Sequence, residues 1–236
     1  MATIENIYTS GQYLANNPVW NAEDAHWKAA IIAGLMKKHS IIPQTMSEAG
    51  CGAGAILENL SKEFPTIDKL TGYDISPQAI EQAAKKTSDR LQFVAMDISR
   101  EKIPHSQLML VIDVIEHLED CFGFVRKIKD EADHFIFHIP LDMSFRTVMK
   151  PHVLLQQRQA VGHIHYFTEE TALWLLQDSG YRIMDKVYTK PVTDVQKPQS
   201  LWKGVKKNLR NLSFALNKTA SVKLWGNYSI MVLASR

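Results

Sequence analysis

The seven residues Glu48-Ala49-Gly50-Cys51-Gly52-Ala53-Gly54 lie at the end of a predicted strand, 45–49, and open a predicted helix, 54–63. Glycines here let the backbone turn sharply and approach a ligand, and the helix N-terminus offers unpaired N–H groups to that ligand. A dinucleotide-binding fingerprint has the spacing G-x-G-x-x-G, but position 55 is Ala and the third glycine, Gly54, comes one residue early. The spacing therefore argues against an NAD site.

An acidic residue follows the second predicted strand. Asp74 ends the strand 68–74, twenty residues beyond Gly54. A carboxylate at that position can accept hydrogen bonds from both hydroxyls of a ribose. The glycine loop and Asp74 together predict a nucleoside-binding site.

Strands and helices alternate on both sides of this loop. The apolar periodicity predicts helices at 22–39, 77–87, 119–131 and 169–179, and strands at 91–96, 107–113, 134–140, 181–189 and 227–234. Such alternation is typical of an α/β protein with a parallel sheet and helices on both faces. The segment 141–167 shows no clear pattern, and we interpret it as a long connection of the kind that often carries function.

The composition is that of an ordinary globular protein. The chain has 236 residues, of which 45% are hydrophobic and 22% charged, which excludes disordered and collagen-like classes. The two cysteines, Cys51 and Cys121, form neither a disulfide framework nor a C-x-x-C zinc motif. We find no apolar stretch of membrane-spanning length and no signal peptide at the N-terminus, so we expect a cytoplasmic protein.

Basic residues are concentrated near the C-terminus. Eight Lys and Arg residues and no acidic residue follow Asp194, which leaves 19 basic against 25 acidic residues, a formal charge of −6, in the remainder. Within a basic helical insertion at about 191–226, a helical wheel separates an apolar arc from a basic arc. The apolar arc contains Leu201, Trp202, Val205, Leu209, Leu212 and Leu216, and the basic arc contains Lys203, Lys206, Lys207 and Arg210.

Two interpretations of this amphipathic helix remain open. In the first, the helix near 201–216 makes a peripheral contact with an anionic membrane. In the second, which we favour, it is a lid that packs its apolar arc on the sheet and leaves the basic arc in solvent. Nucleic acid is not an expected partner, because the acidic remainder would repel phosphates.

Four motifs in this order resemble the class I S-adenosylmethionine-dependent methyltransferases. Residues 48–54 match the first motif, E/D-x-G-x-G-x-G, and Asp74 and Asp97 stand where the family has acidic residues after its second and third strands. Residues 110–118, LVIDVIEHL, resemble the D-V-I/L-E-H-L motif of the ubiquinone-biosynthesis type of small-molecule methyltransferases. Residues 162–168, GHIHYFT, are similar to a G-H-x-R-x-F-T stretch of the same group, with His165 where Arg is commoner.

The resemblance implies a Rossmann-like seven-stranded sheet of order 3-2-1-4-5-7-6 with strand 7 antiparallel. It implies S-adenosyl-L-methionine as the cofactor and S-adenosyl-L-homocysteine as the product. No residue is predicted to bind a metal, and the metal dependence stays open. We expect a helical cap over 1–40 and a methyltransferase domain over 41–236. The residues expected to bind the cofactor are Glu48, Gly50, Cys51, Gly52, Gly54, Asp74, Ile75, Asp97, Ile98, Asp113 and Val114.

The expected reaction is O-methylation of a small molecule, such as a glycan, lipid or quinone precursor. An oxygen nucleophile has to lose its proton, and histidine is the natural general base near neutral pH. The candidate catalytic residues are His117, His163 and His165, while His138 is equally well explained as a buried strand residue. A non-catalytic S-adenosylmethionine-binding module and a nucleic-acid or protein methyltransferase are the alternatives, and the oligomeric state stays open.

Overall fold

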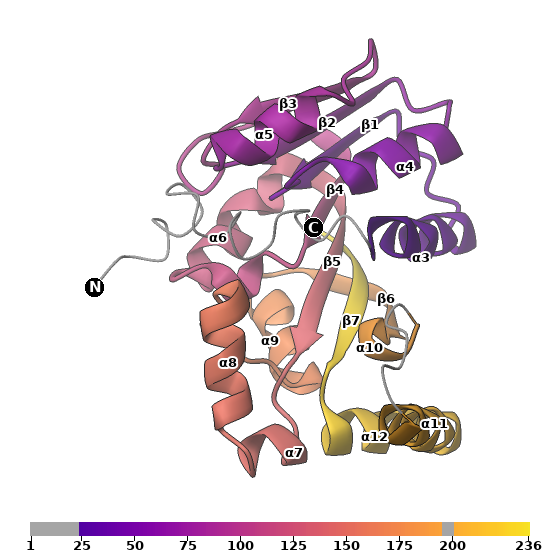
Figure 1. Cartoon of the computed structure of the whole chain (residues 1–236). Helices are drawn as coiled ribbons and strands as arrows, with labels where there is room; N and C mark the ends of the chain where they lie inside the picture. The colour runs from indigo at the N-terminus through magenta and orange to yellow at the C-terminus, as the bar shows by residue number, and fades with distance from the viewer. Residues whose placement is uncertain (1–23, 195–200) are drawn as a thin grey trace.

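The computed structural model describes residues 24–194 and 201–236 (Figure 1). Its strands are β1 (Thr45–Ala49), β2 (Lys69–Asp74), β3 (Leu91–Ala95), β4 (Ser106–Ile112), β5 (Ala132–Leu141), β6 (Arg182–Thr189) and β7 (Tyr228–Ser235). Its helices are α3 (Ala25–Lys38), α4 (Ala55–Glu63), α5 (Pro77–Ala84), α6 (Cys121–Ile128), α7 (Phe145–Val148), α8 (His152–Val161), α9 (Glu169–Asp178), α10 (Pro191–Asp194), α11 (Leu201–Leu216) and α12 (Lys218–Trp225). None of these described helices is both long enough and apolar enough to cross a bilayer.

The strands form one seven-stranded sheet of order β3-β2-β1-β4-β5-β7-β6. The strands β1 to β5 pair in parallel, whereas β7 runs antiparallel to both β5 and β6. The predicted strand order and the antiparallel strand 7 are therefore confirmed. Because the carboxyl ends of parallel strands meet at one edge of a sheet, the loops after β1, β2, β3, β4 and β5 lie close together there.

The core has one layer on each face of the sheet. Alternate residues of β5 point to opposite faces, so Phe135 and Phe137 join a cluster with α6 and α9, and Ile136 joins a cluster with α3 and α4. All three side chains are fully buried, and burial of one such side chain contributes roughly 1.5–3 kcal/mol. The described part of the predicted cap, α3, is thus packed into the core against α4.

The segment 141–167, which we expected to be a loose connection, contains two helices. The helix α7 begins with a capping box in which the side chains of Ser144 and Thr147 bond each other's backbone N–H. The helix α8 buries none of its residues, so its sequence carries no apolar stripe to reveal it. The expectation of an irregular connection was wrong here because a solvent-exposed helix lacks the periodicity that a buried face imposes.

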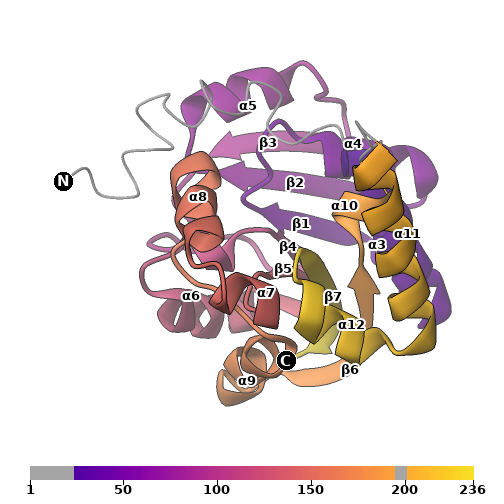
Figure 2. The same cartoon turned by 60° about the horizontal axis from the view of Figure 1, so that its bottom comes forward.

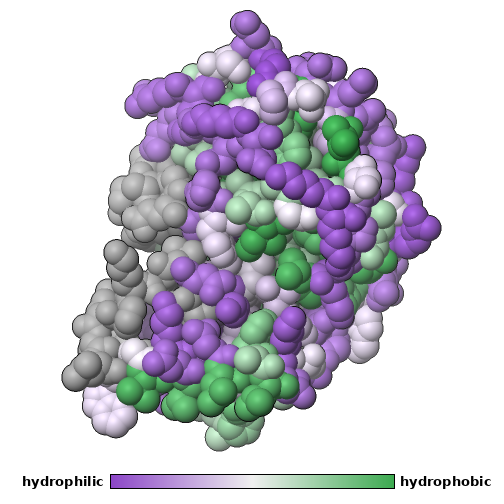
Figure 3. Space-filling view, turned by 90° about the vertical axis from the view of Figure 1, so that its right-hand side faces the viewer, coloured by the Kyte–Doolittle hydropathy of each residue, from purple (hydrophilic) through white to green (hydrophobic). Residues whose placement is uncertain are grey.

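The lid interpretation of the basic insertion is wrong, because α11 turns its apolar arc away from the protein. Trp202, Leu212 and Leu216 are 77%, 58% and 80% exposed, and Val205 and Leu209 are about half exposed. The helix lies on the outside of the molecule beside α12 (Figure 2), and its apolar side chains gather along the lower edge of Figure 3. The side chains of Leu201 and Lys203 lie outside the described residues.

The inner face of α11 is held by polar contacts. Arg210, which we expected in solvent, is 8% exposed, donates a hydrogen bond to the carbonyl of Gly226 at 2.5 Å and stacks on Tyr228 at 4.9 Å. The hydroxyl of Ser213 accepts a hydrogen bond from the Trp225 indole of α12 at 3.0 Å. These bonds orient α11 with its apolar arc outward, which a helical wheel alone does not predict.

The helices α10, α11 and α12 interrupt an antiparallel hairpin. The strands β6 and β7 pair from Arg182 opposite Ser235 to Thr189 opposite Ser229. The inserted segment therefore leaves and re-enters the sheet at neighbouring positions. The helices of this segment run from Pro191 to Trp225.

Candidate active site

The loop between β1 and α4 requires its glycines. Gly50, Gly52 and Gly54 have φ angles of 68°, 52° and 75°, in the left-handed region that other residues rarely adopt. A Cβ atom on Gly50 would lie 2.6 Å from Cγ2 of Val114, so the loop also packs too closely for a side chain. The loop therefore presents bare backbone at the carboxyl edge of the sheet.

Asp74 fixes this loop to the end of β2. Its carboxylate accepts hydrogen bonds from the backbone N–H of Gly52 and of Ser76, both at 2.8 Å. Burial raises the pKa of Asp74, and the two N–H donors act in the opposite direction. Each carboxylate oxygen retains a lone pair that a ribose hydroxyl could use.

A cavity of about 580 Å³ opens at this edge, within the size range of sites for small molecules and cofactors. The predicted cofactor residues that line it are Glu48, Gly50, Cys51, Gly52, Asp74, Ile75, Asp97, Ile98, Asp113 and Val114. The remaining one, Gly54, is the N-cap of α4 instead. The carboxylate of Asp97 is engaged locally, by the backbone and hydroxyl of Ser99 and by Arg100.

Two ionisable side chains in the cavity wall are neutralised by burial. Burial raises the pKa of the Cys51 thiol well above its usual value, with Asp74 and Glu48 adding to the shift. A protonated thiol is a poor nucleophile, so the cysteine contributes backbone and volume rather than reactivity. Burial likewise raises the pKa of Glu48 well above its usual range, while the charge of Lys28 opposes the shift.

An ion-pair network that the sequence does not reveal lies behind the cavity. Asp113, in the left-handed region at φ 53°, accepts a hydrogen bond from Nζ of Lys28 at 2.6 Å and lies 2.6 Å from Nδ1 of His138. The Nε2 atom of His138 lies 2.8 Å from the hydroxyl of Thr189, and Lys28 also pairs with Asp24 at 2.9 Å. Nothing local in the sequence connects Lys28 with Asp113, which stands 85 positions further along the chain.

This network keeps Asp113 charged. Burial alone would favour the neutral acid, but His138 and Lys28 outweigh it and lower the pKa of Asp113 far below its usual value. Burial would also lower the pKa of Lys28, yet Asp113 and Asp24 raise it above its usual value. Both oxygens of Asp113 are thus used within the protein, although the residue lines the cavity.

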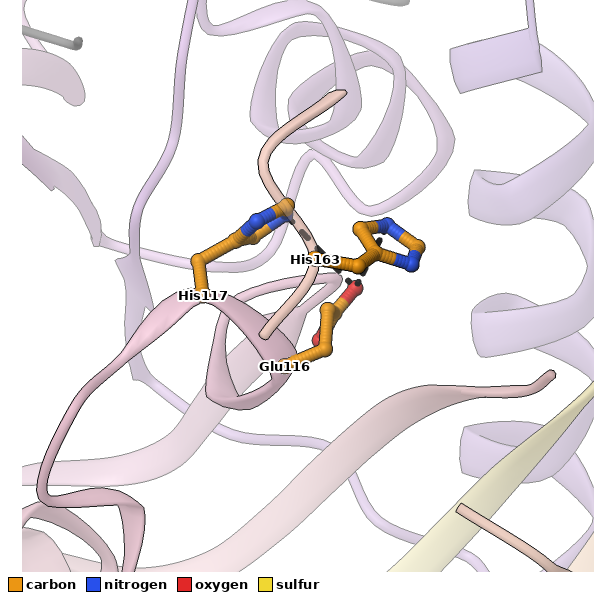
Figure 4. Close-up of side chains that lie close together, drawn as sticks. All are labelled: Glu116, His117 and His163. Carbon is orange, nitrogen blue, oxygen red and sulfur yellow. Dashed lines mark ion pairs between the residues drawn. The ribbon is translucent and has the colours of Figure 1, made fainter. Parts of the chain in front are cut away.

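His117 and His163 meet at a buried carboxylate, and we call Glu116, His117 and His163 the Glu–His–His cluster (Figure 4). The Nε2 atoms of the two histidines lie 3.8 Å and 4.0 Å from Oε1 of Glu116. The two rings contact each other edge to face, with centroids 4.9 Å apart. Since His117 also lines the cavity, the cluster lies directly beside it.

A further carboxylate orients His163. Its Nδ1 lies 2.7 Å from Oδ2 of Asp142, whose other oxygen accepts a hydrogen bond from Nε2 of Gln157 at 2.7 Å. Because a carboxylate favours a proton on the nitrogen that faces it, Nε2 of His163 keeps its lone pair directed at the cluster. The sequence points to His163 and offers Asp142 as an alternative base, but it does not reveal that the two residues pair.

The cluster carries little charge. Burial, followed by the nearby charge of Asp113, raises the pKa of Glu116 well above its usual range. Burial, followed by the proximity of His163, lowers the pKa of His117 to about 4. Two imidazoles and a carboxylate that converge in this way can accept a proton or hold a divalent cation.

His165, the third predicted catalytic histidine, makes a different contact. Its Nε2 donates a hydrogen bond to the carbonyl of Leu118 at 2.7 Å, which ties the loop before α9 to the segment after β4. His165 is absent from both the Glu–His–His cluster and the cavity lining of the described residues. Its catalytic role stays a prediction without a supporting contact.

Several solved structures share this fold. A methyltransferase of Haloferax volcanii, solved in complex with the Trm112 activator, is 15% identical, with a TM-score of 0.66 over 99% of this chain and 97% of that one. Magnesium protoporphyrin IX methyltransferase of Synechocystis PCC 6803 with bound SAH is 15% identical, with a TM-score of 0.61 over 89% and 83% of the two chains. The methyltransferase domain of a bacterial Hen1 is 15% identical, with a TM-score of 0.58 over 92% and 100%.

The sequence itself matches a family model. None of the curated protein sequences matches this chain. The model described as "Methyltransferase domain", however, matches residues 43–186, more than half of the chain. With the glycine loop, Asp74 and the strand order in place, the chain belongs to this methyltransferase family and is a class I enzyme that uses S-adenosylmethionine.

Proposed function

We propose that this enzyme transfers the methyl group to a hydroxyl oxygen of a small molecule, such as a glycan, lipid or quinone precursor, at the Glu–His–His cluster. The observation that supports this proposal is the position of His117, which belongs both to the cluster and to the wall of the cofactor cavity. An acceptor held against the cluster lies next to bound cofactor.

The chemistry explains why a buried cluster suits this reaction. The acceptor oxygen attacks the methyl carbon in line with the C–S bond, so the site has to hold oxygen, carbon and sulfur in a row. The C–S bond breaks as the O–C bond forms, and the sulfonium becomes a neutral thioether. The hydroxyl proton has to leave at the acceptor oxygen, where the lone pair of His163 faces the cluster.

Calorimetry with S-adenosylhomocysteine tests the cofactor site. We expect Asp74→Ala to weaken binding by about 1.5–3 kcal/mol, the usual worth of hydrogen bonds to a charged group. Asp68→Ala is the matched control, because Asp68 is exposed near the opposite end of β2. Equal binding by both variants would remove Asp74 from the cofactor site.

Turnover against a panel of hydroxylated metabolites separates an enzyme from a non-catalytic binding module. We expect His163→Ala to lower kcat roughly 10²- to 10⁴-fold while S-adenosylhomocysteine binds as before. Methylation of RNA or of a protein, with every hydroxylated metabolite inert, would favour the alternative classes. Unchanged kcat would mean that the proton leaves elsewhere.

We also propose that α11 docks on an anionic lipid bilayer. Lys206 of α11 and Lys218 at the start of α12 are exposed, and no acidic residue follows Asp194. Apolar insertion combined with attraction to anionic headgroups is how amphipathic helices bind membranes. A second copy of the chain fits less well, because a symmetric contact through α11 would bring like charges together.

Sedimentation with phosphatidylcholine vesicles that contain increasing phosphatidylglycerol tests this contact. We expect binding to rise with the anionic lipid and to fall with salt. Leu209→Asp should abolish it, whereas Leu155→Asp, the same change on exposed α8, should leave it intact. The Haloferax neighbour is bound to an activator protein. Self-association or a stoichiometric protein complex through α11, without vesicle binding at low salt, would contradict the proposal.

A further inference from the structure

Glu116 is a buried acid that the described protein leaves unsatisfied. Its side chain is 0% exposed, and neither carboxylate oxygen has a hydrogen-bond partner among the described residues. Leaving a buried acceptor unpaired costs about 1–3 kcal/mol, and more for a charged group. Lys28 donates no hydrogen bond to Glu116, because its ammonium group pairs with Asp113 and Asp24.

The atoms around Glu116 form a ligand set. One carboxylate oxygen and one nitrogen from each of His117 and His163 all lie within 4.8 Å of one another. First-row divalent ions hold nitrogen and oxygen ligands at about 2.0–2.2 Å, which places neighbouring ligand atoms roughly 3–4 Å apart. The observed separations of 3.8 Å and 4.0 Å from Glu116 need little contraction to reach that geometry.

The surroundings of His163 match those of a metal ligand. Histidines that bind metals commonly donate their other N–H to a carboxylate, which fixes the tautomer and makes the ligating nitrogen more basic. Asp142 occupies this position, and Gln157 in turn holds Asp142. This outer pair gives the site a preformed ligand independently of the unsatisfied oxygens of Glu116.

We propose that Glu116, His117 and His163 bind a divalent first-row transition ion, such as Mn²⁺, Fe²⁺ or Zn²⁺, although no metal ligand was predicted from the sequence. Three protein ligands leave coordination positions open, as in catalytic rather than structural sites. The inference rests on the proposed function in one respect: the acceptor hydroxyl fills an open position. When bound, the ion would lower the pKa of that hydroxyl, and the proton would pass to water because the ion would occupy the lone pair of His163. The O–C bond would then form as the C–S bond of the cofactor breaks.

Titration of chelator-treated protein with Co²⁺ tests the site without reference to activity. We expect one equivalent to bind with the visible absorption of a low-symmetry Co²⁺ centre, and Zn²⁺ to displace it. Glu116→Gln and His163→Ala should each weaken binding at least 100-fold. Asp142→Asn, a change in the outer pair, should weaken it 10- to 100-fold. His152→Ala is the matched control, because His152 is exposed on α8 outside the cluster.

The outcomes separate this inference from the proposed function. Absence of a Co²⁺ spectrum in folded wild-type protein, or an equal spectrum in Glu116→Gln, would overturn the metal site. Full hydroxyl methylation by chelator-treated protein would overturn it as well and leave the proposed function standing. Stoichiometric metal binding in a protein that binds S-adenosylhomocysteine but methylates no hydroxyl would support the site and reject the proposed function.

Discussion

Replacing Lys28 with Met would leave the carboxylate of Asp113, whose side chain is 27% exposed, with one of its two partners. The Lys28 side chain is 7% exposed, and its Nζ lies 2.6 Å from Asp113 and 2.9 Å from Asp24. Met has a similar length and no charge, so the change removes the ion pairs and keeps most of the volume. The cavity wall would then contain an undercompensated negative charge.

The magnitude follows from the geometry. At 2.6 Å and an effective dielectric constant of 20, the attraction between Lys28 and Asp113 is about 6 kcal/mol. The cost of burying the ammonium group offsets part of this, and loss of one partner from a buried pair typically costs 3–5 kcal/mol. Since Asp113 is partly exposed and His138 still lies 2.6 Å from its other oxygen, we expect the lower end of this range, about 3 kcal/mol.

Urea unfolding followed by circular dichroism measures this free energy. Lys37→Met is the matched control, because Lys37 lies on the same helix and pairs with Glu63 while both side chains are about half exposed. An exposed pair contributes less than about 1 kcal/mol. Adding Asp113→Asn to Lys28→Met should recover part of the loss, since the uncompensated charge disappears. If Lys28→Met costs no more than Lys37→Met, the network does not stabilise the fold as argued.

Two further changes probe the loop and the cluster. Gly50→Ala should lower the affinity for S-adenosylhomocysteine at least tenfold, because φ is 68° and the new Cβ would meet Val114 at 2.6 Å; unchanged affinity by calorimetry would contradict this. Burial, followed by His163, lowers the pKa of His117 from 6.5 to about 4, so the unfolded chain takes up this proton first as pH falls. Because of His117, the free energy of unfolding should therefore fall by up to about 3 kcal/mol between pH 6.5 and pH 4. In urea unfolding, His117→Gln should lose stability less steeply than the wild type as the pH falls. Equal pH dependence in the two proteins would refute the lowered pKa of His117.

The strands were the most predictable elements because each is buried and bounded by clear turn signals. The run 107–113, for example, predicts β4 to within one residue at each end. Helix α8 escaped prediction because it buries no side chain. The wheel for α11 sorted its side chains correctly, but periodicity does not say which face meets the protein. The face that meets the protein is set by the hydrogen bonds of Arg210 and Ser213 to Gly226 and Trp225, which follow the helix in the sequence.

The residues of the candidate site also differ in how far the sequence predicts them. Residues in contiguous motifs, such as Gly50, Asp74 and His117, are recognisable because their chemistry depends on local backbone geometry. Lys28 and Asp142 act through partners that only the fold brings near, Asp113 at a separation of 85 positions and His163 at 21. A single sequence carries no signal for such pairs.

The hairpin that α10, α11 and α12 interrupt has a consequence for how this protein can diversify. Thr189 and Ser229 face each other across adjacent strands, roughly 5 Å apart, so the two ends of the inserted segment are already brought together by the sheet. Closing a longer loop between fixed ends costs only about 0.6 kcal/mol for each doubling of its length. The open end of the β6–β7 hairpin is therefore a position that tolerates insertion. Helices of another length, or a whole additional module, could replace α10, α11 and α12 there while the sheet kept its strand order.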